Sequence, residues 1–220
     1  MTLGDLLMNA YFANDIFRLY RFKCGPYDNN AYLIVCNQTN ESLLIDTPDE
    51  PEELIDFASQ TNVQMIAITH NHIDHLLGFE KVIASIKAPV AIGALDAHAL
   101  SQSPDILLNG DEEFNIGNLT VESIFTPGHT EGSTCFILED HLFTGDTLFV
   151  GGPGRSKSPE AFNELLNSIS TKLLNLSGNI RFYPGHGLDG LLDDAKSEYQ
   201  VFINRQHSDS LYGDIEWLIS

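Results

Sequence analysis

The sequence predicts an α+β protein built on two β-sheets, and three observations predict this class. Apolar runs of strand length alternate with segments of helical pattern in both halves of the 220-residue chain. Hydrophobic residues make up 43% of the sequence, which supplies a sizeable core. Linkers, short repeats and low-complexity tracts are lacking, so we expect one domain, or two tightly fused halves, over residues 1–220. Strands and helices that occur twice over suit a two-sheet sandwich.

The first half is expected to form most of one sheet. The helix predicted at 51–60 begins with acidic residues, which suit the positive end of a helix dipole. The apolar run at 63–69 has the length and composition of a buried strand. In order, the predicted elements are strands at 16–24, 30–36 and 41–46, a helix at 51–60, a strand at 63–69, a helix at 75–86 and a strand at 89–92.

The second half repeats this mixture of strands and helices. Ser158, Pro159 and Glu160 predict the start of a helix, because serine caps a helix N-terminus well and proline fits its first turn. In order, the predicted elements are strands at 119–125, 133–138 and 141–143, a helix from 158 to about 176, a strand at 180–183 and a final helix at 191–204.

Three histidines and an aspartate follow directly on the strand predicted at 63–69. His70, His72, Asp74 and His75 fall within six consecutive positions. Imidazole and carboxylate are the side chains that hold zinc, iron and manganese. A His-x-His pair on an extended chain points both rings to one side, because side chains alternate with period two. Histidine and aspartate are costly to bury without partners, so this cluster indicates a metal site rather than a packing need.

Three more candidate ligands stand at the ends of later strands. His129, Asp146 and His186 each follow one of the strands predicted in the second half. Each lies in a turn that contains glycine, which lets the backbone turn sharply and approach a ligand closely. Donors at four strand ends favour a metal centre at the edge of the sheets.

In order along the chain, the motifs are His-x-His-x-Asp-His, Gly-His, Gly-Asp and Gly-His, and this series resembles the metallo-β-lactamase superfamily from about Asn30 to His186. The resemblance implies a four-layer αββα sandwich with two divalent metal ions at the edge of its sheets. Zinc is the favoured ion, with iron and manganese as alternatives, because the same ligands accept all three. Carried over position by position, the resemblance implies His70, His72 and His129 as ligands of the first metal, Asp74, His75 and His186 as ligands of the second, and Asp146 as a bridge between them.

Within the superfamily, the chain is similar to the glyoxalase II-like (hydroxyacylglutathione hydrolase-like) hydrolases. The runs Phe143–Phe149 and Thr126–Thr130 resemble theirs, whereas β-lactamases often carry a cysteine at the position of Asp146. Asp46 resembles an acidic residue at an earlier strand end of the family, where it would orient a metal ligand. The alternative is that Asp46 only forms the turn before Pro48.

The departures from glyoxalase II concern the substrate. The segment after His186 is too short for the helical domain that helps glyoxalase II bind glutathione, and no tyrosine follows shortly after His186. Pro153 stands where the related families often have cysteine. Arg155 is retained, and it is either a group that binds a substrate carboxylate or an ordinary exposed arginine. The sequence therefore leaves open whether glutathione is part of the substrate.

Two enzyme hypotheses follow from the ligand series. In the first, a metal-bridged hydroxide attacks the carbonyl of a small thioester, ester or lactone, and Asp74 also accepts the proton of the attacking water. In the second, a single iron ion on His70, His72 or His129, and Asp146 activates dioxygen, as in persulfide dioxygenases. A binding protein that keeps the fold without catalysis is a third class, which the complete ligand series disfavours.

Charge and composition limit the partners and the compartment. The formal net charge of −20 weighs against nucleic acid, because phosphate binding needs clustered lysine and arginine. No apolar run reaches the roughly 18 residues of a membrane-spanning helix, so we expect no membrane contact. Residues 1–15 lack the lysine or arginine of a secretory signal. Cys24, Cys36 and Cys135 fit buried thiols in the cytoplasm better than disulfides, although a Cys24–Cys36 pair beside a hairpin is conceivable.

The remaining histidines and aromatic residues are expected to be structural. His98, His141 and His207 match no ligand position, so surface or packing roles are predicted for them. Tyr212 and Trp217 are expected to anchor the last segment to the body, or else to lie in a homodimer contact. The oligomeric state and the acyl and leaving groups of the substrate are left open by the sequence.

Overall fold

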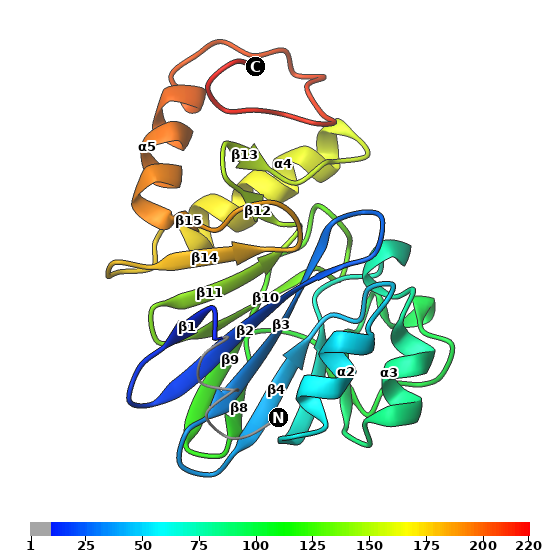
Figure 1. Cartoon of the computed structure of the whole chain (residues 1–220). Helices are drawn as coiled ribbons and strands as arrows, with labels where there is room; N and C mark the ends of the chain where they lie inside the picture. Colours follow the sequence, from blue (N-terminus) through cyan, green and yellow to red (C-terminus); the bar gives the residue numbers. More distant parts are fainter. Residues whose placement is uncertain (1–9) are drawn as a thin grey trace.

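The computed structural model describes residues 10–220, so the first nine residues of the predicted domain 1–220 lie outside the described residues. Two β-sheets face each other, and helices cover the outer face of each sheet (Figure 1). Three buried apolar clusters fill the spaces between these layers. The predicted α+β, four-layer αββα sandwich is confirmed.

The first sheet has seven strands that lie in chain order. Its part of the chain comprises β1 (Phe12–Ala13), β2 (Phe17–Cys24), β3 (Asn29–Cys36), β4 (Glu41–Ile45), α2 (Glu52–Ala58), β5 (Asn62–Ile68), the 3-10 helix Ile73–His75, α3 (Phe79–Ser85), β6 (Val90–Gly93), the 3-10 helix Ala97–Ala99 and β7 (Ile106–Leu108). Strands β1 to β4 pair antiparallel, and β4 to β7 pair parallel. The parallel half directs the carboxyl ends of β5 and β6 to the same edge.

The second sheet has six strands in the order β15-β14-β11-β10-β9-β8. Its part of the chain comprises β8 (Glu113–Ile116), β9 (Leu119–Phe125), β10 (Thr134–Leu138), β11 (His141–Gly145), β12 (Leu148–Phe149), β13 (Gly152–Pro153), α4 (Pro159–Ser168), the π-helix Ile169–Leu173, β14 (Arg181–Pro184), β15 (Gly190–Leu191) and α5 (Leu192–Ile203). β12 and β13 form a separate two-stranded sheet. β11 and β14 pair parallel, so both deliver the residues after them to one edge.

The core shows why the strands are apolar on both faces. Along β3, Leu33 and Val35 pack into the cluster under α2 and α3, whereas Tyr32 and Ile34 pack between the two sheets. Alternate side chains of one strand point to opposite faces, so a strand in a middle layer buries every residue. A third cluster lies between the second sheet and helices α4 and α5 and contains the fully buried Trp217.

The helix predicted at 75–86 is wrong in its first turn. The chain instead forms the 3-10 turn Ile73–His75, and α3 begins only at Phe79. Gly78 donates its N–H to the carbonyl of Thr47 at 2.9 Å, and a side chain at Gly78 would clash with the carbonyl of Pro48. The loop after β4 therefore holds the backbone in a turn, which aims His75 into the interior instead of along a helix.

The sequence patterns did not indicate six short strands of two to four residues, namely β1, β7, β8, β12, β13 and β15. All three cysteines are free and buried. Cys24 lies opposite Asn29 and Cys36 lies opposite Phe17 in the β2–β3 hairpin, so these two thiols stand at opposite ends of the hairpin. They are therefore too far apart for the Cys24–Cys36 disulfide considered above.

No helix within residues 10–220 is both long enough and apolar enough to cross a membrane.

Candidate metal centre

The predicted ligands meet at one edge of the sandwich, although they come from both sheets. Four of them follow β5 of the first sheet, and the others follow β9, β11 and β14 of the second sheet. In each of two groups, one candidate ligand atom per residue lies within 4.8 Å of the others. The first group is His70, His72, His129 and Asp146, and the second group is Asp74, His75 and His186.

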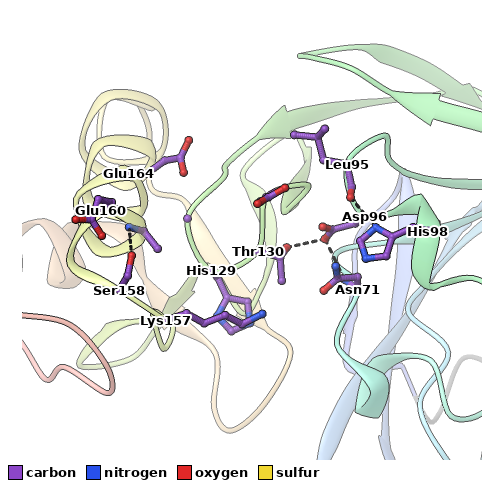
Figure 2. A pocket seen from close by; sticks show the side chains of 13 residues that line it. Asn71, Leu95, Asp96, His98, His129, Thr130, Lys157, Ser158, Glu160 and Glu164 are labelled. Carbon is purple, nitrogen blue, oxygen red and sulfur yellow. Dashed lines mark hydrogen bonds between the residues drawn. The ribbon is translucent and has the colours of Figure 1, made fainter.

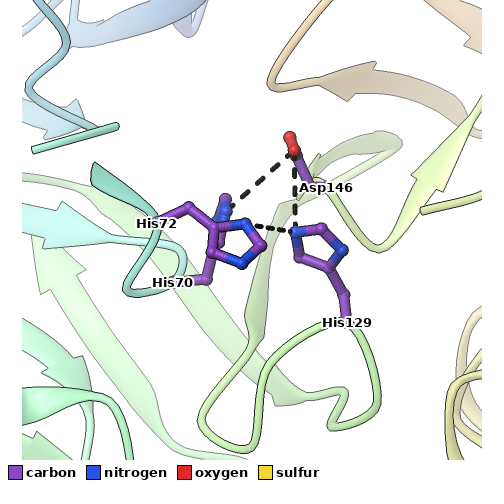
Figure 3. Close-up of side chains that lie close together, drawn as sticks. All are labelled: His70, His72, His129 and Asp146. Atoms are coloured by element: carbon purple, nitrogen blue, oxygen red, sulfur yellow. Dashed lines mark hydrogen bonds and ion pairs between the residues drawn. The ribbon is translucent and has the colours of Figure 1, made fainter. Parts of the chain in front are cut away.

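The first group surrounds a small space beside the Asp146 carboxylate (Figure 3). His129 Nε2 lies 2.9 Å from His72 Nδ1 and 3.7 Å from Asp146 Oδ2. His70 Nε2 lies 4.0 Å from the same carboxylate oxygen. His70 and His72 thus present their rings to one side, as the His-x-His spacing predicts.

The second group lies on the other side of Asp146. His186 Nε2 is 3.1 Å from Asp74 Oδ2 and 3.3 Å from His75 Nε2. His75 Nε2 lies 3.3 Å from Asp146 Oδ1, while Asp146 Oδ2 is the oxygen nearest the first group. One carboxylate therefore faces both groups, which is the position that the resemblance implies for a bridge.

The spacing of these atoms fits metal coordination. Ligand atoms about 2.0–2.2 Å from one tetrahedral ion lie about 3.3–3.6 Å from one another. The separations run from 2.9 to 4.0 Å in the first group and from 3.1 to 3.5 Å in the second group, on either side of this value. His70 Nε2 and Asp146 Oδ1 are buried and form no hydrogen bond with the described residues. Buried polar atoms without partners are costly, so a cation between them would satisfy the site.

Hydrogen bonds on the far nitrogen of most ligand rings fix how the rings face. When Nδ1 donates to an oxygen, Nε2 keeps its lone pair for a metal. Three such contacts hold at 2.8–3.0 Å: His70 Nδ1 with the Thr69 hydroxyl, His129 Nδ1 with the Arg155 carbonyl, and His186 Nδ1 with the Tyr27 carbonyl.

Asp46 provides the corresponding contact for His75. Its Oδ2 lies 2.9 Å from His75 Nδ1, and its carboxylate also accepts the N–H and hydroxyl of Thr69. Asp46 is buried and adopts φ of 63°, a conformation that aspartate tolerates better than most residues. The geometry supports the interpretation of Asp46 as an orienting residue, and it shows contacts that a simple turn former would not need.

Burial keeps the histidines of the first group neutral. It lowers the pKa of His70 well below the usual value, and the neighbouring imidazoles act in the same direction. Burial likewise lowers the pKa of His72 to about 4, and it lowers the pKa of His129. Neutral imidazoles are the form that binds a metal.

The second group has the opposite electrostatics. Burial opposes the charged form of His75, but the carboxylates of Asp46 and Asp146 outweigh it and hold the pKa of His75 well above the usual value. For His186, burial is likewise outweighed, mainly by the Asp74 carboxylate, and the pKa is raised. Asp74 is partly buried, but the contacts with His186 and Asn29 hold its pKa well below the usual range.

Asn29 is a site residue that the motifs did not reveal. Its side-chain amide donates to Asp74 Oδ2 at 2.8 Å, and its backbone forms a bridge with His186. The signal in the sequence is a pair of amides, Asn29 and Asn30, that opens an otherwise apolar strand; both are buried. Gly185 is also required, because a side chain there would clash with Asp146 and His75.

A cavity of about 610 Å³ adjoins the first group and is lined in part by His129 (Figure 2). Its other walls come from the loop after β5, the segment after β6 and the start of α4. The charged residues of its lining are Lys157, Glu131, Glu160, Glu164 and the buried Asp96. A cavity of this size suits a small-molecule substrate.

The other predicted residues lie where they cannot bind the same metals. The Arg155 side chain is 74% exposed and pairs with Asp214 at 3.7 Å. His98 is exposed on the cavity wall, His141 is buried against Tyr183, and His207 stacks on Phe202. None of the three histidines belongs to a ligand group in residues 10–220.

A four-layer sandwich with histidine and aspartate donors at the edge of its sheets defines a class of metal-dependent hydrolases. The sequence profile described as the metallo-beta-lactamase superfamily matches residues 24–186, and the chain belongs to this superfamily.

Relatives and solved structures agree with this membership. The chain is 30% identical over 209 residues to the probable polyketide biosynthesis zinc-dependent hydrolase BaeB of Bacillus velezensis. This match spans 84% of this chain and 92% of that protein. The chain is 31% identical over 172 residues to the probable hydroxyacylglutathione hydrolase glo2 of Schizosaccharomyces pombe. This match spans 74% of this chain but only 65% of that protein. The crystal structure of ETHE1 from Myxococcus xanthus matches with a TM-score of 0.71 and 25% identity over 82% of this chain and 81% of that one. That of the BLEG-1 B3 metallo-beta-lactamase matches with a TM-score of 0.74 and 26% identity over 81% and 96%.

Proposed function

We propose that the chain hydrolyses a thioester of a small molecule with the help of two divalent metal ions, of which zinc is favoured. The observation that carries the proposal is the pair of ligand groups that share Asp146. The hydroxyacylglutathione hydrolase and zinc-dependent hydrolase relatives support thioester cleavage and zinc. Esters and lactones stay within the same chemistry, because each presents a carbonyl with an oxygen or sulfur leaving group.

The residues of the chain would divide the work as follows. His70, His72 and His129 would hold the first ion, Asp74, His75 and His186 the second, and Asp146 both. When bound, the ions would lower the pKa of a water towards neutrality and polarise the substrate carbonyl. Asp74 would also accept a proton from the attacking water, but its lowered pKa makes it a weak base, so ligation is its main role.

The charges that line the cavity beside the first group favour some leaving groups of the substrate over others. Three exposed glutamates, Glu131, Glu160 and Glu164, face one cation, Lys157, in its lining. Like charges repel, so a leaving group with several negative charges is disfavoured here. We therefore propose substrates with at most one anionic group, a number that glutathione, with two carboxylates, and coenzyme A, with its phosphates, both exceed.

Lys157 is better placed than Arg155 to bind a substrate carboxylate. Lys157 lines the cavity, and its charge lowers the pKa of His72 and His129, which places it close to the first group. Arg155 would have to leave Asp214 before its side chain could serve the site. Its backbone carbonyl already has a role, because it accepts the His129 Nδ1 hydrogen bond.

The experiment is a kinetic panel on protein loaded with zinc. The panel holds acyl thioesters of N-acetylcysteamine, glutathione and coenzyme A, an aryl ester and a homoserine lactone. We expect the N-acetylcysteamine thioester to give the highest kcat/KM and the Asp146→Asn variant to be inactive, with His207→Gln as a control outside the site. Equal inactivity of the unaltered protein towards every carbonyl substrate would refute the proposal.

The alternative enzyme is an iron-dependent oxidoreductase of the persulfide dioxygenase type. The likeness to ETHE1 favours keeping it, and the first group alone supplies three histidines and a carboxylate to one ion. Dioxygen uptake with glutathione persulfide by the iron-loaded protein separates the two functions. Uptake with one iron per chain, and no hydrolysis with zinc, would place this alternative first.

A further inference from the structure

A buried carboxylate outside both ligand groups joins the two loops that carry the first group. Asp96 follows β6 and is fully buried. Its Oδ2 accepts the N–H of Asn71 at 3.0 Å and the hydroxyl of Thr130 at 2.6 Å (Figure 2). Its Oδ1 accepts the N–H of Gly132 at 2.9 Å. Hydrogen bonds to a carboxylate are stronger than those between neutral groups.

Two of the residues that Asp96 contacts, Asn71 and Thr130, are direct chain neighbours of ligands of the first group. Asn71 stands between His70 and His72 in the loop after β5, whereas Thr130 directly follows His129 in the loop after β9. The first loop belongs to one sheet and the second loop to the other. Asp96 therefore fixes the distance between two ligands on one sheet and a third ligand on the opposite sheet.

The surroundings are shaped to admit this carboxylate. A Cβ at Gly132 would lie 2.7 Å from Cβ and Cγ of Asp96, so a larger residue there would displace it. Ser133 supports the same turn, because its hydroxyl accepts the N–H of Thr130 at 3.0 Å. The loop is thus ordered around the carboxylate rather than merely next to it.

We propose that Asp96 is a positioning residue for the first metal, acting through Asn71 and Thr130 on His70, His72 and His129. This proposal rests on the proposed metal site. Loss of a general structural residue would weaken both sites, whereas loss of a positioning residue of the first group weakens the first site and spares the second. The second group has its own buried carboxylate, Asp46, which contacts His75 and Thr69.

The test uses Asp96→Asn, which keeps the size and removes the charge. The amide oxygen can still accept from Gly132, but the amide nitrogen would face the two donors on Asn71 and Thr130. We expect zinc affinity at the first site to fall about tenfold, at the lower end of the effect of outer partners of metal ligands. Thr130→Val removes one donor only, so a smaller loss at the same site is expected.

The two sites are separated by background variants. In His186→Ala the second group lacks a ligand, so titration reports the first site, and in His129→Ala it reports the second. Zinc is titrated in competition with a chromophoric chelator, and Co²⁺ absorption gives an independent reading. Asp105→Asn is the control outside the site, because the exposed Asp105 also accepts a backbone N–H, that of Val90 at 2.9 Å, and among residues 10–220 it forms no hydrogen bond or ion pair with the ligand loops.

The outcomes are distinct. Weaker zinc binding by Asp96→Asn in the His186→Ala background, with unchanged binding in the His129→Ala background and a native circular dichroism spectrum, supports the proposal. Unchanged binding in both backgrounds, or equal weakening in both, overturns it. If Asp96→Asn does not fold, Thr130→Val decides in the same two backgrounds. If the unaltered protein binds no zinc at all, the proposed function fails instead.

Discussion

Replacement of Asp46 by asparagine should weaken the second metal site and spare the first. Asparagine has nearly the same shape as aspartate and tolerates the φ of 63° at this position, so backbone strain does not confuse the result. Its oxygen can still accept the N–H and the hydroxyl of Thr69, which lie 2.8 and 3.1 Å from Asp46 Oδ1. The contact of this hydroxyl with His70 Nδ1 can therefore persist, so the first group keeps its own orienting contact. The amide nitrogen would then face His75 Nδ1, which in the unaltered protein lies 2.9 Å from Asp46 Oδ2.

The size of the effect follows from the two ways in which His75 can respond. If Nδ1 keeps its hydrogen, two donors face each other in a fully buried position, which costs about 1–3 kcal/mol. If the hydrogen moves to Nε2, that atom loses the lone pair that a metal needs. Either way the bound state is penalised by about 1–3 kcal/mol, which is a loss of about 5- to 150-fold in affinity.

The assay is zinc competition with a chromophoric chelator at neutral pH, performed in the His129→Ala background so that the second site is read. Thermal unfolding of the metal-free variant serves as the control for folding. Affinity within twofold of the parent, with a normal melting temperature, would refute the reasoning that Asp46 sets the ring orientation of His75. Equal losses at both sites would show a general structural role instead.

Three further predictions concern the same architecture. Asp146→Asn should lose metal and activity together, because one carboxylate faces both groups. Metal analysis by mass spectrometry and a hydrolysis assay measure the two losses. Full activity with two bound metals would disprove the bridging role of Asp146. Acidification should release the second metal before the first: metal binding requires neutral imidazoles, and His75 and His186, whose pKa values are raised, take up protons at a higher pH than the first group, whose pKa values are lowered. Dialysis at stepwise lower pH with metal analysis of each site variant measures the order, and the reverse order would contradict it. Trp217→Ala should lower the free energy of unfolding by about 3–5 kcal/mol, because the indole is fully buried in the third cluster. Urea unfolding measures this change. A loss under about 1 kcal/mol would show that Trp217 does not hold the C-terminal segment to the rest of the protein.

The candidate ligands could be identified in the sequence because each one obeys a local rule. His70, Asp146 and His186 all follow an apolar strand within a few residues, and parallel strands bring such positions to one edge. Because histidine and aspartate are common metal ligands, these positions indicate a metal site. Chain order and turn position indicated the seven candidate ligands, and the resemblance to the metallo-β-lactamase superfamily divided them between two metals.

The residues that were not predicted depend on contacts between distant parts of the chain. Asn29 meets His186 only because β3 and the loop after β14 come together, across a separation of 157 residues. Asp96 follows strand β6 just as the ligands follow theirs, so the same rule had a signal for it, but it lies in no motif. Residues 75–78 were predicted as the first turn of a helix, because the contact of Gly78 with the loop at Pro48, which excludes a side chain at Gly78, leaves no signal in the local sequence pattern.

The split of the ligands between the two sheets has a consequence for how the chain acquires its metal during synthesis. His70, His72, Asp74 and His75 leave the ribosome first, but neither group is complete until a residue of the second sheet has been made: Asp146 completes the first group and His186 the second. The nascent first half therefore offers only part of each coordination shell. In the proposed site, a complete coordination shell would form only after both sheets have folded. The metal ions available to the folded protein would then decide which ion binds, more than the affinities of the unfolded peptide would.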